Sequence, residues 1–461
     1  MHINPEFQRN IWLYVTLPRL LVFPVILTGS VYLLSLFEKL GPQLICSILF
    51  WTFIIITGAL GANRVGSSTI TEIQGRTWHL QRLTSISPWS MVWGKLFGST
   101  VLYWYWGFWC LGAFSIFQAQ LSIDSFNLFF FSEGLIPGFL YLIGFGLFCQ
   151  ILGMMGAMAQ LKDIRIYKYK TGADSFLTGW IIIGLILTAL FADVEDKAVI
   201  SWYGSEFLVV YFWLTSLYAL AGWCLLGNYL LMRKEFDMPN LPFVWIGFCV
   251  FLIFYCMGFE FDFYKEITGE HAALLKRIAV AFGFILFTTY VMLMWEKTDA
   301  FAIRQFLLRI KYRQVREALN EMPRGFISAI LACAVGGWFV GAFLFFKGSF
   351  SPQTINPFGF VGAALCFMTR DLALIQFLNF SEKSKSSMAN PLILLILYIC
   401  LPGLFYFMEW REWLSLFYPL YTPISPMVAI IPPLVQAMFM CTMVFIRWQG
   451  SKFCLSRLPS H

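Results

Sequence analysis

The spacing of charged residues is the feature that most constrains the fold of this chain. Twelve stretches of at least 18 residues contain no Asp, Glu, Lys or Arg. A helix needs about 20 mostly apolar residues to cross the hydrocarbon core of a bilayer, so the sequence predicts twelve membrane-spanning helices. The last stretch is long and rich in proline, and we expect its spanning part at about 425–446. The stretches are 20–37, 40–63, 96–123, 134–161, 175–192, 207–232, 238–259, 278–295, 325–346, 348–369, 386–408 and 413–446.

The overall composition excludes a water-soluble protein. Hydrophobic residues make up 59% of the 461 residues and charged residues only 12%, whereas a soluble protein carries roughly 25% charged residues. A cytosolic enzyme, a nucleic-acid-binding domain and a disordered chain are therefore excluded, and nucleic acid is not expected as a partner. We predict an all-α polytopic membrane protein, surrounded by membrane lipids, in the cytoplasmic (inner) membrane of a bacterium.

The distribution of basic residues predicts the orientation of the spans. If both termini are cytoplasmic, only seven of the 32 Lys and Arg residues fall in outer loops. The other 25 lie on the inner side, as the positive-inside rule requires. Omitting one helix would reverse the side of every later loop and destroy this asymmetry. Twelve spans with both termini in the cytoplasm are therefore expected.

The inner segments predict two six-helix halves, residues 1–236 and 237–461. Each half reads as two helices, a long inner segment, two helices, a short inner segment and two helices, with the long segments at 62–95 and 296–324. Parallel repeats of this kind occur in transporters, and one chain would then supply both halves of a pathway. The alternative is that any twelve-helix chain divides into two sixes, in which case a homodimer is expected.

The long segment of the second half predicts an amphipathic helix over 297–322. Apolar residues recur at helical spacing from Leu308 to Met322, and a basic stripe lies on another side of the same helix. Such a helix suits either the anionic inner leaflet or a soluble partner, and the pattern favours the membrane surface. The candidate residues for this second cytoplasmic contact are Arg309, Arg313, Arg316 and Leu319.

The most specific stretch of the sequence runs from Glu72 to Leu96. Its middle offers an apolar side with leucines and a polar side with Gln and Arg residues, and a Ser/Thr cluster before Pro88 is typical of a helix start. The residue pattern alone favours a short interfacial helix that anchors the loop.

The same stretch resembles the first intracellular loop of permeases of ATP-binding-cassette (ABC) transporters of the type-2 exporter class. The start of the chain, Asn4-Pro5-Glu6 with Arg9, is similar to the amphipathic elbow helix of that family. Two departures are Arg76, which stands between Gly75 and Thr77, and Ser85, which replaces the usual Pro. The residues at matching positions are Glu72, Thr77, Leu80, Leu83, Thr84, Ile86, Ser87, Gly94, Lys95 and Leu96.

The resemblance implies a mechanical role in an ATP-driven exporter. In that family the loop forms a coupling helix that sits in a groove of a separate ATPase subunit, which binds ATP and Mg. The chain has no GxxxxGK[ST] phosphate loop, so we expect a transporter subunit that is not itself an enzyme and binds no cofactor. The expected coupling residues are Glu72, Gly75, Arg76, Thr77, Leu80, Leu83, Thr84, Ile86, Ser87 and Pro88.

A run of aromatic residues is a candidate lining for an amphipathic substrate. The run falls near the middle of the predicted third span, where packing between helices is the alternative explanation. Its members are Tyr103, Trp104, Tyr105, Trp106 and Trp109.

Two other functions remain open. A secondary transporter would need an ionisable group inside the membrane, and Arg370-Asp371 is expected to be a charge pair at the cytoplasmic end of a helix instead. An integral membrane enzyme acting on lipid or glycan would need a nucleophile with a base, paired carboxylates or a metal site, and the sequence pattern predicts none of these. The cysteines lie mostly in apolar runs without CxxC spacing, which predicts buried thiols and no metal site.

Overall fold

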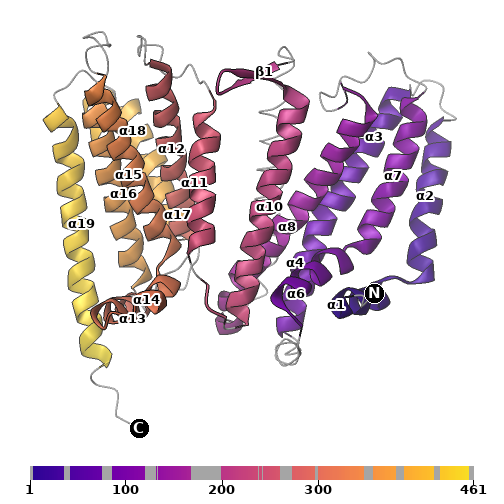
Figure 1. The fold of residues 1–461 in the computed structure, drawn as a ribbon, viewed down its shortest axis with the longest axis horizontal. Helices are drawn as coiled ribbons and strands as arrows, with labels where there is room; N and C mark the ends of the chain where they lie inside the picture. The colour runs from indigo at the N-terminus through magenta and orange to yellow at the C-terminus, as the bar shows by residue number, and fades with distance from the viewer. Residues whose placement is uncertain are drawn as a thin grey trace. The chain divides into compact units, whose positions relative to one another are not determined.

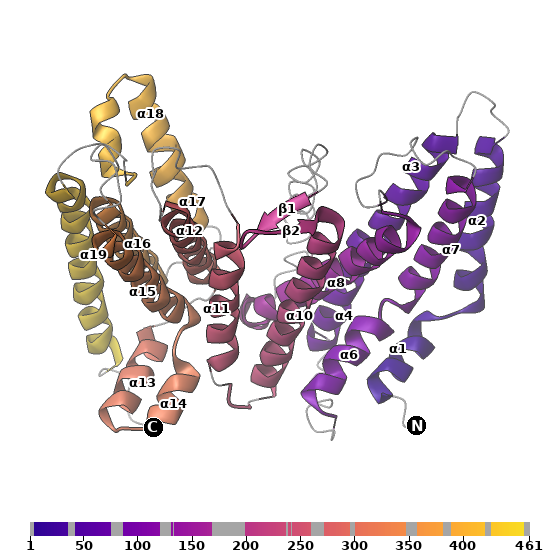
Figure 2. The ribbon, with the colours of Figure 1, turned by 45° about the horizontal axis from the view of Figure 1, so that its top comes forward.

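The computed structural model is almost entirely helical and divides into two compact units (Figures 1 and 2). Unit 1 comprises residues 1–200 and 206–240, and unit 2 comprises residues 201–205 and 241–461. The structure describes residues 4–35, 42–74, 86–119, 131, 133–167, 199–236, 238–240, 242–259, 272–295, 300–346, 357–380, 389–419 and 426–455.

Unit 1 begins with a short helix that lies crosswise to the long helices that follow it (Figure 1). A π-helical segment, η1, joins α3 to α4, so these three elements make one continuous helix. The helices are α1 (Pro5–Tyr14), α2 (Leu17–Ser35), α3 (Pro42–Phe53), η1 (Ile54–Leu60), α4 (Gly61–Gln74), α6 (Pro88–Gly98), α7 (Val101–Gln118), α8 (Leu135–Tyr167) and α10 (Val209–Glu235).

Unit 2 also contains long helices, with a pair of short helices, α13 and α14, at one end of the bundle (Figure 1). Its elements are α11 (Phe243–Met257), α12 (Ala272–Trp295), α13 (Ala300–Lys311), α14 (Val315–Glu321), α15 (Arg324–Phe345), α16 (Pro357–Asn379), α17 (Ala389–Leu395), the π-helix η6 (Ile396–Cys400), α18 (Leu401–Phe407), the 3-10 helix η7 (Arg411–Leu416) and α19 (Pro426–Leu455). The strands β1 (Val199–Trp202) and β2 (Ser205–Leu208) form a two-stranded sheet.

The chain is an integral membrane protein with a helical fold. Within the described residues, eight helices are long and apolar enough to cross a bilayer. Two shorter apolar helices lie at Phe243–Met257 and Leu392–Phe407. The predicted fifth span, 175–192, lies outside the described residues, so twelve spans and cytoplasmic termini stay predictions. The eight are Leu17–Ser35, Pro42–Glu72, Leu135–Met158, Val209–Glu235, Ala273–Leu293, Arg324–Phe345, Phe358–Asn379 and Ala429–Gln449.

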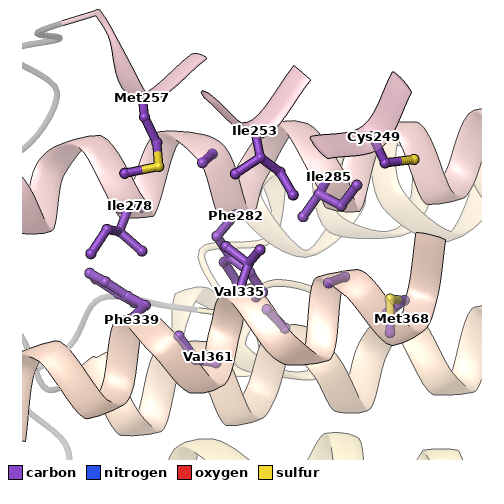
Figure 3. Packing of buried hydrophobic residues seen from close by; sticks show 14 of the residues in the cluster. Cys249, Ile253, Met257, Ile278, Phe282, Ile285, Val335, Phe339, Val361 and Met368 are labelled. Atoms are coloured by element: carbon purple, nitrogen blue, oxygen red, sulfur yellow. The ribbon is translucent and has the colours of Figure 1, made fainter. Parts of the chain in front are cut away.

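Each unit has its own apolar core. Figure 3 shows the core of unit 2, where side chains of α11, α12, α15 and α16 interlock around Phe282. In unit 1 the largest core cluster joins α3, α7 and α8, and a second joins α4, α6, α8 and α10. Helices at the margins, such as α2 and α19, bury little and expose mostly apolar side chains, as expected where the surroundings are lipid rather than water.

The two long inner segments differ from their predicted form. Most of 62–95 is helical, because α4 continues to Gln74 and α6 begins at Pro88, so that only 75–87 connects the two helices. Val65 and Thr69 of α4 are completely buried, and packing against α8 keeps this polar stretch helical.

The single amphipathic helix predicted over 297–322 is wrong, because α13 and α14 are separate helices. α13 ends in a Schellman-type turn, in which the Gln314 backbone N–H donates to the Arg309 carbonyl at 2.9 Å. Arg313 adopts a left-handed conformation with φ 57° in this turn. The apolar stripe from Leu308 to Met322 therefore does not run along one helix face.

Candidate functional site

The N-terminal helix α1 turns its polar side toward the protein. Asn4 caps the helix by accepting a hydrogen bond from the Glu6 backbone N–H at 3.0 Å, and Pro5 occupies the first turn. Glu6 and Asn10 are buried, with 3% and 1% exposure, whereas Trp12 on the other side is 79% exposed. A surface helix of a soluble protein has the opposite arrangement, so α1 is built to meet lipid with its apolar side.

Two glycines of α6 allow α1 to approach closely. A Cβ atom added to Gly94 would lie 2.6 Å from the Glu6 Cβ, and one added to Gly98 would lie 2.8 Å from the Asn10 Cβ. The Gly94-x-x-x-Gly98 spacing therefore serves helix packing, as such spacing does elsewhere. The corresponding spacing at Gly337 and Gly341 does not, because none of the residues that the structure describes lies within 4 Å of either added Cβ.

Four charged side chains meet where α1, α4 and α6 come together. Lys95 of α6 lies 3.3 Å from a carboxylate oxygen of Glu6 and also pairs with Glu72 at the end of α4. Arg9 of α1 lies 2.7 Å from the same Glu6 oxygen and also pairs with Glu72. We call these four residues the elbow cluster; its two acids and two bases balance in charge.

Burial makes the pairing in the elbow cluster obligatory. The Lys95 side chain is 1% exposed and that of Glu6 is 3% exposed, and an isolated buried charge costs several kcal/mol. Each of these two ions is therefore tolerated only because an opposite charge lies beside it. The cluster ties the two ends of the 75–87 connection to each other and to α1.

Hydrogen bonds from two asparagines reinforce the contact between α1 and α6. Asn4 donates to the Ser90 carbonyl at 2.6 Å, and Asn10 donates to the Gly94 carbonyl at 3.4 Å and to the Glu6 carbonyl at 2.9 Å. One turn after Asn10 on the same side of α1, the Tyr14 ring lies 3.9 Å from the Arg64 guanidinium of α4. Three elements that are far apart in the sequence thus form one connected body.

The residues predicted to form the coupling loop fall into two groups. Glu72 belongs to the elbow cluster, Ile86 packs against the apolar cluster of α4, α6, α8 and α10, and Ser87 caps α6 by accepting a hydrogen bond from the Ser90 backbone N–H at 3.2 Å. Pro88 opens α6, so the predicted helix start is confirmed. Six predicted residues lie outside the described residues: Gly75, Arg76, Thr77, Leu80, Leu83 and Thr84.

Lys95, Asn10 and Gly98 were missing from the predicted site. Lys95 marks the edge of a charge-free stretch, and a lysine at that place is normally expected to reach water. The signal for its burial was the Gly94-x-x-x-Gly98 spacing around it, which places a second helix close to the Lys95 backbone.

The predicted aromatic lining residues lie in the first half of α7. Trp104 is buried and donates to the Gln150 Oε1 at 3.0 Å, while Trp106 stacks on Phe23 of α2 with ring centroids 5.2 Å apart. Tyr103 contacts the edge of Trp106, and Tyr105 contacts the edge of Trp109. The Trp104 and Trp106 contacts join α7 to α8 and α2, whereas the two tyrosine contacts lie within α7.

Gln150 connects that aromatic run to the π-helix η1. Its amide nitrogen donates to the Thr57 carbonyl at 2.8 Å, and its oxygen accepts from Trp104. A π-helical turn leaves backbone groups poorly paired, and such turns are frequent at functional sites. Gln150 supplies the partner that keeps this turn stable inside a membrane-spanning helix.

In unit 2, Arg370 and Asp371 do not form the expected charge pair at a helix end. They lie inside α16, nine and eight residues before its last residue, and are 4% and 0% exposed. Arg370 Nε lies 2.8 Å from the Asp371 carboxylate and also donates to Gln436 of α19 at 2.6 Å and to the Tyr398 hydroxyl at 3.0 Å.

Asp371 is held from the opposite side by two tyrosines. Tyr290 of α12 donates to its carboxylate at 2.8 Å, and Tyr398 of the π-helix η6 donates to the same oxygen. We call Arg370, Asp371, Tyr290, Tyr398 and Gln436 the α16 cluster. A carboxylate therefore does lie within an apolar span, and the expectation that Arg370-Asp371 stands at a helix end is wrong.

The predicted second contact residues lie on α13, on α14 and in the turn between them. Arg309 is turned toward Glu317, 3.6 Å away, and Leu319 is half-buried. Arg313 and Arg316 are exposed. No group of three or more His, Cys, Asp or Glu side chains that would hold a metal ion occurs in the part of the chain that the structure describes.

Comparisons of the chain with models of protein families, with curated proteins and with solved structures found no match. The fold defines the class of the protein, a helical integral membrane protein with two compact units. What such a protein does must be argued from the elbow cluster and the α16 cluster.

Proposed function

We propose that the chain is the membrane-spanning permease subunit of an ATP-driven exporter of the ABC type-2 class. ATP and Mg would bind to a separate ATPase subunit, and the loop between α4 and α6 would dock on that subunit. The chain itself would move a substrate across the membrane without catalysing a reaction.

The observation that carries the proposal is the meeting of three segments in the elbow cluster. The resemblance to type-2 permeases includes the N-terminal elbow, Glu72 and Lys95, which belong to three separate segments of the sequence. Charged side chains of these segments meet in one ionic network, with Arg9 and Lys95 both paired to Glu72. The segments that separately resemble parts of a coupling region are therefore also in contact with one another.

The elbow cluster suits a loop that must transmit force. A push on 75–87 would reach Glu72 on one side and α6 on the other, and the ion pairs would oblige α1 to move with both. Because α4 continues through η1 into α3, displacement at the loop would reach the middle of the span. The π-helix there, paired through Gln150, is the place where the helix would bend most readily.

Docking of the ATPase is tested by charged substitutions in the loop. Replacing Thr77, Leu80 and Leu83 together with Glu should abolish co-purification of the ATPase subunit, because an apolar contact would face three negative charges. Gln81→Glu, on the polar side of the same loop, is the matched control and should leave co-purification intact. Unchanged recovery of the ATPase with the triple variant would contradict the docking assignment.

A secondary transporter is the second candidate, and one observation favours it. Asp371 is a completely buried carboxylate within an apolar span, and intramembrane ionisable residues commonly mark proton or ion pathways. The pairing of Asp371 with Arg370 and two tyrosine hydroxyls argues for a structural role, since protonation would leave the buried guanidinium without its counter-ion.

The energy source separates the two candidates. If the chain is an ABC permease, transport into inverted vesicles should require ATP. It should continue when an uncoupler dissipates the proton gradient. Transport that persists without ATP and stops with the uncoupler would instead establish the secondary transporter.

A further inference from the structure

We infer that the α13–α14 pair of unit 2 is a membrane-surface anchor that binds acidic phospholipid headgroups. This inference does not depend on the proposed transport function. It rests on where the pair is attached, on which of its side chains are exposed, and on its charge.

The pair is attached at the level where the spans end. α14 ends at Glu321, three residues before α15 begins at Arg324, and α13 begins five residues after α12 ends at Trp295. Arg304 of α13 donates to the carbonyl of Trp448 at 3.2 Å and lies 5.9 Å from the Trp448 ring centre. Trp448 is the last residue but one of the candidate span Ala429–Gln449, a position typical of the membrane–water interface.

The pair exposes a large apolar surface. Large apolar side chains exposed together are costly in water and mark a surface that another phase or partner covers. Tyr312 and Val315 lie on either side of the turn that joins the two helices, and the others lie on α13. The five residues are 45–69% exposed: Leu307, Leu308, Ile310, Tyr312 and Val315.

Basic side chains lie among these apolar side chains. Residues 300–324 contain six basic and two acidic residues, which gives a net charge of +4. Lys311, Arg313 and Arg316 are exposed, whereas Glu317 is engaged with Arg309 at 3.6 Å. Apolar side chains with interspersed Lys and Arg are the composition of helices that lie in a lipid interface, where the long basic side chains reach phosphate groups.

Lipid is favoured over a soluble partner because of the attachment. Both helices are held within a few residues of membrane-spanning segments, so lipid headgroups are always within reach. The Schellman-type turn at Arg313 folds α14 back beside α13, which keeps the exposed apolar side chains together.

The test is oxidative footprinting of the full-length chain in lipid nanodiscs. Hydroxyl radicals oxidise exposed aromatic side chains, and mass spectrometry reports the rate at Tyr312. We expect this rate to be at least about threefold lower in discs of phosphatidylcholine with phosphatidylglycerol than in phosphatidylcholine alone, because acidic headgroups attract the cations. High salt should remove the difference, since it screens that attraction.

Matched controls separate a lipid contact from a general change in the disc. The rate at Trp410, an exposed residue whose sequence neighbours Glu409, Arg411 and Glu412 carry a net negative charge, should be equal in both lipids. The variant Lys311→Gln/Arg313→Gln/Arg316→Gln should lose the lipid dependence, and Gln314→Asn in the same turn should keep it.

Two results would overturn the inference. One is an equal oxidation rate of Tyr312 in both lipids for the unmodified chain, a comparison that does not depend on any variant folding. The other is protection of Tyr312 that appears only when an ATPase subunit is added, whatever the lipid, which would assign the surface to a protein partner. Neither result bears on whether the 75–87 loop docks an ATPase, because that loop belongs to unit 1.

Discussion

The elbow cluster and the α16 cluster both bury charge, but they connect different kinds of structure. The elbow cluster joins α1 to the ends of α4 and α6, at the edge of a loop, with two acids and two bases. The α16 cluster joins α12, α16, η6 and α19 within the helical bundle, with one acid, one base and two hydroxyls. The first links α1 to the two helices on either side of the 75–87 connection, and the second links the helices of a bundle to one another.

The difference shows how the same chemistry serves two purposes. Removing one member of a buried ion pair costs about 3–5 kcal/mol, because the remaining charge is left unpaired. In unit 2 that penalty keeps four helical elements in place. In unit 1 it holds α1, α4 and α6 together beside the 75–87 connection, as the proposed transmission of movement would require.

The largest effect is expected from Lys95→Met. This substitution leaves Glu6 and Glu72 with one base between them, and we expect a loss of about 3–5 kcal/mol in the free energy of unfolding. Reversible unfolding of the purified chain in mixed micelles would measure it. The double variant Lys95→Met/Glu6→Gln should recover part of the loss, because the two residues interact directly. Strictly additive losses would show that the pair is not coupled.

A somewhat smaller effect is expected from Asp371→Asn. The amide oxygen can still accept from the two tyrosines, but Arg370 loses its counter-ion, and we expect a loss of about 2–4 kcal/mol. Co-purification of the ATPase should not change, since the α16 cluster has no member near the 75–87 loop in the sequence. Loss of ATPase binding with a stably folded Asp371→Asn chain would contradict the division of roles between the two clusters.

The smallest change in the free energy of unfolding is expected from substitutions at two glycines. Gly94→Ala places a methyl group against Glu6 and should cost about 1–3 kcal/mol through overpacking. Gly337→Ala is the matched control, because nothing lies within 4 Å of its added Cβ. It should be neutral or stabilising by up to about 1 kcal/mol through helix propensity. Equal effects of the two changes would mean that α1 does not pack on α6 as described.

Charge-free stretches predicted where most long helices lie, because an unpaired charge is excluded from lipid. The same rule wrongly predicts Arg370 and Asp371 at a helix end, because it ends a span at the first charged residue. The charge-free stretch begins at 348, whereas α16 begins nine residues later at Pro357 and ends at Asn379. Both charged residues therefore lie inside the helix. A charged side chain that pairs with the neighbouring residue can lie within a membrane-spanning helix.

Local signals predicted part of the candidate site. The Ser87-Pro88 start of α6, the elbow helix and the importance of Glu72 all follow from capping chemistry or from the resemblance. The break at Arg313 carried no such signal, because left-handed turns at helix ends are normally marked by Gly or Asn. The burial of Lys95 depends on a helix that lies far from it in the sequence. The Gly94-x-x-x-Gly98 spacing indicates that some helix packs closely there, but it does not say which one.

A photocrosslinking amino acid at Leu83 gives the most direct test of the central claim, that the 75–87 loop receives a nucleotide-hydrolysing partner. Illumination of cells that express this variant should join the chain to a second protein, and sequencing of the adduct should find a GxxxxGK[ST] loop in it. Attachment only to lipid, or labelling of a cysteine at the same position by a reagent confined to the outside of the cell, would contradict the account.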